Sequence, residues 1–75
     1  MALEVGKIYK YTSENYPLEI YQVISIGAFY QIHTLVGTLR GPISTIGAIQ
    51  ANSTLFETTA TTPEEFQDLY PEFFI

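Results

Sequence analysis

The sequence contains no cysteine and no tryptophan, one histidine, and three basic residues among its 75 positions. Without cysteine and with a single histidine, it has neither disulfides nor a Cys/His metal site, two common ways in which small domains gain stability. A domain of this size buries only about 60% of its unfolded surface. We therefore expect stability to come from a dense core, supplied by six Tyr and five Phe, or from oligomerisation.

Charge is scarce and unevenly distributed. Charged residues make up 15% of the chain, against about a quarter in ordinary soluble domains. Between Glu19 and Glu57 the only formal charge is that of Arg40, and His33 is the only other base. Such an uncharged middle is expected to be buried on both sides or covered by a partner.

The few basic residues exclude several classes of function. The net charge is −5 and the pI is near 4.4, so the Lys/Arg surface needed to bind nucleic-acid phosphates is absent. Anionic membrane surfaces are disfavoured for the same reason. The uncharged stretch 20–39 is too polar for a good membrane span, and the N-terminus lacks the layout of a signal peptide. We expect a cytoplasmic protein, or one within a virion, with no membrane and no direct nucleic-acid partner.

Short segments rich in apolar residues are separated by Gly, Pro, Asn and Ser, and the clearest two-residue period is at 29–36. This pattern predicts β-strands at 5–12, 18–26, 29–36, 43–50 and 54–58. The second of these segments is apolar at both odd and even positions, which is typical of a strand that is buried on both faces or lies in an interface.

The C-terminal part carries the clearest local signal. A threonine-rich linker, 58–62, precedes Thr62-Pro63-Glu64-Glu65, a capping box with Pro at the first helical position. We expect a short helix at about 63–70, because Pro71 disfavours continuation. Its packed face is expected to hold Phe66, Leu69, Tyr70 and Phe73, and the apolar tail 73–75 is expected to dock on the sheet or on a neighbour.

These elements predict a single, mainly β domain spanning 1–75, with the β region at about 4–58. Five short strands with tight turns favour a small antiparallel SH3-like or OB-like barrel, or a curved sheet, with a short C-terminal helix. The alternative is an open sheet with the C-terminal helix packed on it.

Candidate binding residues fall in four places. Arg40 lies in the loop 37–42 next to Leu39, where it could anchor a partner carboxylate or phosphate or serve only solubility. His33 and Gln31 are expected on the outward face of the third strand, where inward positions are Tyr30, Ile32, Thr34 and Val36. The acidic group Glu64, Glu65 and Asp68 either serves the helix dipole or forms a docking surface. Phe73 and Phe74 complete the set of expected partner-binding residues.

No catalytic, cofactor or metal site is expected. His33 has no acid near it in sequence that could orient it as a base. Two carboxylates four residues apart are too few oxygens for most metal sites. Glycine-rich phosphate loops, Cys/His metal spacings and nucleophile elbows are absent from the sequence.

Three functions remain open. The first is a non-enzymatic interaction or assembly module, expected to form homo-oligomers, such as a capsid-decorating or tail-associated virion subunit. The second is a small acidic inhibitor, phage-encoded in one form of the hypothesis, that binds a basic surface of a host defence or nucleic-acid-handling protein. The third is a small-molecule-binding barrel with a tyrosine-lined mouth. Oligomers held by apolar contacts should tolerate salt, whereas an acidic face should not.

Overall fold

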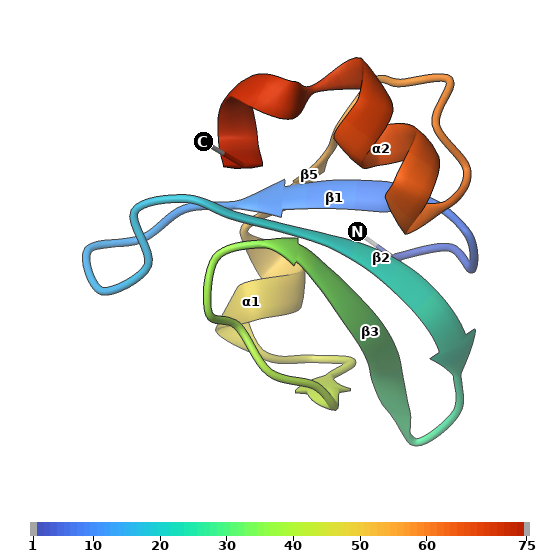
Figure 1. Cartoon of the computed structure of the whole chain (residues 1–75). Helices are drawn as coiled ribbons and strands as arrows, with labels where there is room; N and C mark the ends of the chain where they lie inside the picture. The colour runs from blue at the N-terminus through green and yellow to red at the C-terminus, as the bar shows by residue number, and fades with distance from the viewer. Residues whose placement is uncertain (1, 75) are drawn as a thin grey trace.

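The computed structural model describes residues 2–74 (Figure 1). Met1 and Ile75, the last residue of the expected docking tail, lie outside the described residues. The elements follow the order β1 (Ile8–Tyr11), β2 (Glu19–Ile26), β3 (Phe29–Val36), β4 (Ile43–Ser44), α1 (Ala48–Ala51), β5 (Ser53–Leu55), α2 (Pro63–Leu69) and the 3-10 helix η1 (Pro71–Phe74).

The five strands form one antiparallel sheet in the order β4-β3-β2-β1-β5. The sheet curls into a half-barrel, with α1 inside the curve below and α2 and η1 above β1 in Figure 1. The predicted mainly β fold, with five antiparallel strands and a short C-terminal helix, is confirmed. Of the forms expected, the curved sheet is the one observed, with β4 and β5 at its two edges within residues 2–74.

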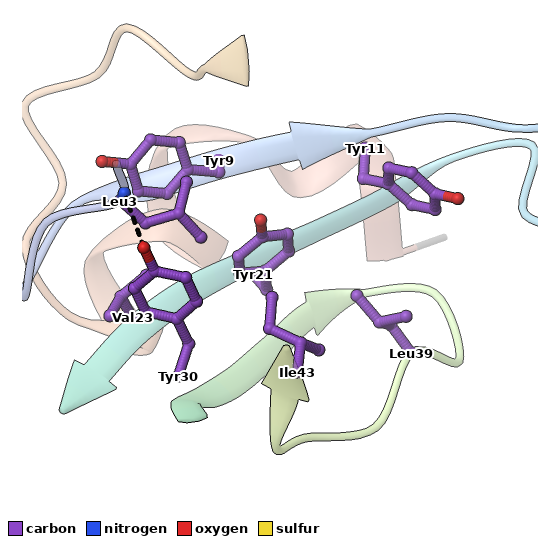
Figure 2. Packing of buried hydrophobic residues seen from close by; sticks show 8 residues of the cluster. All are labelled: Leu3, Tyr9, Tyr11, Tyr21, Val23, Tyr30, Leu39 and Ile43. Carbon is purple, nitrogen blue, oxygen red and sulfur yellow. Dashed lines mark hydrogen bonds between the residues drawn. The ribbon is translucent and has the colours of Figure 1, made fainter. Parts of the chain in front are cut away.

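Both faces of the sheet are covered. One face carries the tyrosine core, formed by Leu3, Tyr9, Tyr11, Tyr21, Val23, Tyr30, Leu39 and Ile43 (Figure 2). The opposite face carries the C-terminal core, in which Ile8, Ile20, Ala60 and Phe66 are buried and Phe56, Tyr70 and Phe73 are partly buried. Neighbours in sequence alternate between the two clusters, because successive side chains of a strand point to opposite faces. This explains why β2 is apolar on both sides.

Hydroxyl groups of the tyrosine core form hydrogen bonds with other parts of the chain. The Leu3 N–H donates to the Tyr30 hydroxyl (3.3 Å, Figure 2), and the Glu4 N–H donates to the Tyr9 hydroxyl (2.9 Å). The Tyr21 hydroxyl lies 2.5 Å from Ser53 Oγ. These bonds satisfy polar groups that would otherwise be costly to bury.

Helix α2 begins as the sequence predicts. The Glu65 N–H donates to Thr62 Oγ1 (3.2 Å), and Pro63 occupies the first turn. The Glu65 carboxylate accepts from the Thr61 hydroxyl (2.5 Å) and the Thr61 N–H (3.2 Å), and these hydrogen bonds lower the pKa of Glu65. The Gln22 amide donates to the Thr61 carbonyl (2.7 Å) and fixes the linker to the sheet.

The structure differs from the prediction in several strand boundaries, including the fifth strand, which ends at Leu55, and in the placement of Leu69. The expected strand 43–50 stops at Ser44, because Ser44 Oγ accepts the Ile46 N–H and starts a turn that leads into α1. The first strand begins only at Ile8, since the chain turns before it with Gly6 at φ +84°. Leu69 was expected on the packed face of α2 but is exposed, because that helix ends there and packs through residues earlier and later in the chain.

Candidate functional site

The two predicted binding residues of the loop 37–42 differ in burial: Leu39 is buried and Arg40 is exposed. The Thr38 and Leu39 N–H groups donate to the Glu19 carboxylate at 2.7 Å and 2.5 Å. This buried carboxylate draws the loop toward the sheet, so that the Leu39 side chain enters the tyrosine core with 3% of its surface exposed. The prediction that Leu39 contacts a partner is therefore wrong, because its side chain is not available. Arg40 remains exposed.

Two glycines hold this loop close to the sheet. Gly37 has φ +102°, and a Cβ atom on it would overlap the Glu19 carboxylate. A Cβ atom on Gly41 would lie 2.9 Å from the Ile32 side chain of β3. The exposed Arg40 therefore lies between two positions, 37 and 41, at which the backbone of the loop is close to the sheet.

A cleft of about 190 Å³, here called the β3–α2 cleft, lies between the third strand and the C-terminal helices. It brings together three of the predicted binding residues, His33, Glu64 and Phe74. Its lining is completed by Thr34, Leu35, Pro63 and Gln67.

The remaining predicted residues do not line this cleft. Gln31 is exposed on β3 and Asp68 is exposed on α2, one helical turn after Glu64. Glu65 is engaged with Thr61 and Thr62. Phe73 packs against the C-terminal core. Glu65 and Phe73 are thus engaged within the chain, whereas Glu64 and Asp68 remain neighbours on one face of α2.

A second cleft, of about 340 Å³, was not predicted. It opens between the segment that leads into β1 and the segment 55–61, which diverge beyond the hydrogen bond from the Phe56 N–H to the Ile8 carbonyl (2.9 Å). Lys7 and Glu57 are exposed in its lining. This cleft could not be predicted from a local sequence pattern, because its two walls, residues 5–8 and 55–61, are far apart in the chain. Among the described residues, neither cleft is lined by a tyrosine.

Large apolar side chains gather at one end of the sheet. We call this set the apolar end; its members are Val5, Ile24, Ile26, Phe29 and Ile46, whose exposed fractions run from 46% to 91%. The hairpin between β2 and β3 projects at the lower right of Figure 1, with β4 and the segment before β1 nearby.

Strand register explains this gathering. Phe29 pairs with Ser44, two residues before Ile46, and the Gly6 N–H donates to the Val23 carbonyl, which brings the start of the chain beside the end of β2 (2.8 Å). A register shift between Val23 and Ser25 leaves Ile24 without a paired residue on β3, and β2 is exposed from Ile24 to its end. Sequence analysis left open whether the segment 18–26 is buried on both faces or lies in an interface; its part from Glu19 to Val23 is buried, whereas Ile24 and Ile26 are exposed.

Other kinds of site receive no support from the part of the chain that the structure describes. Within residues 2–74, no three His, Asp or Glu side chains come together as metal ligands. No helix in that range has the length and apolar character needed to cross a membrane. Comparisons with protein-family models, with curated proteins and with solved structures find no match for this chain.

Proposed function

We propose that this protein is a non-enzymatic interaction module that assembles through its apolar end. The observation that carries the proposal is the exposure of five large apolar side chains at one end of the sheet. Three of the five, Ile24, Ile26 and Phe29, lie in the stretch 20–39, which carries no formal charge. Large apolar side chains that are exposed close together in the fold are typical of interaction sites in soluble proteins.

The size of the surface indicates its strength. Five side chains that are about half exposed or more offer an apolar area on the order of 400 Å². A standard stable interface takes about 800 Å² from each partner. The apolar end alone therefore supports weak association, which becomes firm when several contacts act together in a larger assembly.

A second copy of this chain is the partner that we propose first. The side chains of the apolar end carry no charge, so they can form no ion pair with a charged partner. Two apolar ends that meet are stabilised instead by removing apolar surface from water. The more specific proposals, that the protein is a virion subunit and that it is located in the cytoplasm or in a virion, rest on the composition of the sequence alone.

The test is the solution mass, by light scattering after size exclusion, over a range of protein and salt concentrations. Phe29→Glu places a charge in the apolar end, and Leu69→Glu is its matched control, because the two side chains are 53% and 52% exposed. We expect an oligomer that survives high salt, that Phe29→Glu dissociates, and that Leu69→Glu leaves intact. A monomer at every concentration, or equal loss in both variants, would refute the proposal.

The alternative function, an acidic inhibitor of a basic surface, loses part of its basis. Glu57 and Glu64 line different clefts, and Glu65 caps α2. Glu57 and Glu65 are thus set apart from Glu64 and Asp68, which remain neighbours on one face of α2. The acidic surface that still fits this hypothesis is the one around Glu64, at the β3–α2 cleft.

A further inference from the structure

We propose that the β3–α2 cleft binds one arginine side chain of a partner protein. The proposal concerns a different surface from the apolar end and does not depend on self-association. It rests on the volume of the cleft and on two residues of its lining, the carboxylate of Glu64 and the aromatic ring of Phe74.

The volume matches a single side chain. Sites for small organic molecules usually measure about 300–1,000 Å³, and this cleft measures about 190 Å³. Its walls come from separate parts of the chain, β3 on one side and α2 with η1 on the other. A single side chain that enters between the strand and the helices therefore fits this volume better than a larger ligand.

The charge of the cleft selects a cation. Glu64 is the only carboxylate in the lining, His33 is its only base, and no Lys or Arg is among the described residues that form it. Of the three cations of the chain, Lys7 lines the other cleft, Lys10 is on β1, which β2 separates from β3, and Arg40 is in the loop 37–42. An anion would be repelled by Glu64 and by the net charge of −5.

The aromatic ring favours arginine over lysine. Phe74 is 41% exposed, and its ring packs edge-to-face on the fully buried Phe66, with centroids 6.2 Å apart at 82°. This contact holds the Phe74 ring at the cleft without covering it. A planar guanidinium stacks on such a ring and reaches a carboxylate with paired N–H groups, which the compact lysine ammonium cannot do.

The site is tested by NMR titration of the ¹⁵N-labelled protein with N-acetyl-arginine methylamide. The matched probe is N-acetyl-citrulline methylamide, which has nearly the same shape and no charge. We expect saturable shifts confined to the amides around the cleft with the arginine probe and none with citrulline. Shifts that map elsewhere, no saturation at the solubility limit, or equal binding of citrulline would overturn the proposal.

Variants separate the cleft from general electrostatics. Glu64→Gln and Glu72→Gln change the net charge equally, and both positions are exposed, but only Glu64 lines the cleft. We expect Glu64→Gln to weaken binding about tenfold and Glu72→Gln to leave it unchanged. Equal weakening would show diffuse attraction only. The dispersion of each spectrum reports folding, and repeating the titration in the Phe29→Glu variant keeps the result independent of self-association.

Discussion

The substitution Gly37→Ala tests how the loop 37–42 is fixed to the sheet. Gly37 has φ +102°, a region that costs other residues about 1–3 kcal/mol. The added methyl group also overlaps the Glu19 carboxylate, which accepts two backbone N–H groups of the loop. Disturbing hydrogen bonds to a buried charged group costs about 1.5–3 kcal/mol more. We therefore expect the free energy of unfolding to fall by about 3–5 kcal/mol.

Two other glycines separate these contributions. Gly6 has φ +84° with no atom within 4 Å of an added Cβ, so Gly6→Ala carries the backbone strain alone. Gly27 has neither a positive φ nor a close neighbour, and Gly27→Ala should change stability little or raise it slightly. In a Glu19→Ala background, Gly37→Ala should cost only as much as Gly6→Ala.

The assay is urea unfolding followed by tyrosine fluorescence, because the chain has no tryptophan. A chain of this length has a total stability of about 4–11 kcal/mol, so Gly37→Ala should lower the midpoint strongly or prevent folding. The Glu19→Ala background keeps the comparison measurable if the single variant does not fold. A Gly37→Ala cost no greater than that of Gly6→Ala, or the same cost with and without Glu19, would refute this account of the loop.

Other predictions concern the two cores. Phe66→Ala should destabilise by about 3–5 kcal/mol because Phe66 is fully buried, while the exposed Leu69→Ala should cost less than about 1 kcal/mol; similar costs would show that α2 does not dock on the sheet. Ser53 donates its hydroxyl proton to a backbone carbonyl, so Tyr21 must donate to Ser53. Ser53→Ala should therefore cost about 1–3 kcal/mol, and adding Tyr21→Phe should recover part of it in the same urea assay; no recovery would contradict this donor assignment. Burial raises the pKa of Tyr21 and of Tyr9 above the ordinary 10.0, so the folded state retains protons that the unfolded chain releases. Stability should accordingly be unaffected well below pH 10 and fall as the pH rises above it, and tyrosinate absorbance that appears before unfolding would argue against this.

Local sequence patterns predicted the elements that local interactions decide. The capping box at Thr62 and the two-sided apolar pattern of β2 could be predicted because each depends on residues close together in the chain. The segment 43–50 could not, since its apolar, β-branched composition fits a strand, whereas the hydrogen bond from the Ile46 N–H to Ser44 Oγ begins a turn.

Contacts between distant residues decided the rest. From the sequence, Glu19 would be expected to be a surface charge at the edge of an apolar stretch. It is buried instead, and its carboxylate accepts the Leu39 N–H, which places Leu39 at the core. The β3–α2 cleft depends on how α2 packs across the sheet, which no spacing in the sequence encodes. His33 and Glu64 could be named as candidates by residue type, but their meeting in one cleft could not be predicted.

The division of the hydrophobic interior into two clusters has a consequence for how this chain loses its structure. Ile8 and Tyr9 are adjacent in β1 and Ile20 and Tyr21 in β2, yet the members of each pair belong to opposite clusters. A strand that leaves one cluster must therefore leave the other, because the same backbone carries both. The two clusters should melt together as one cooperative unit, with no stage at which only one of them persists.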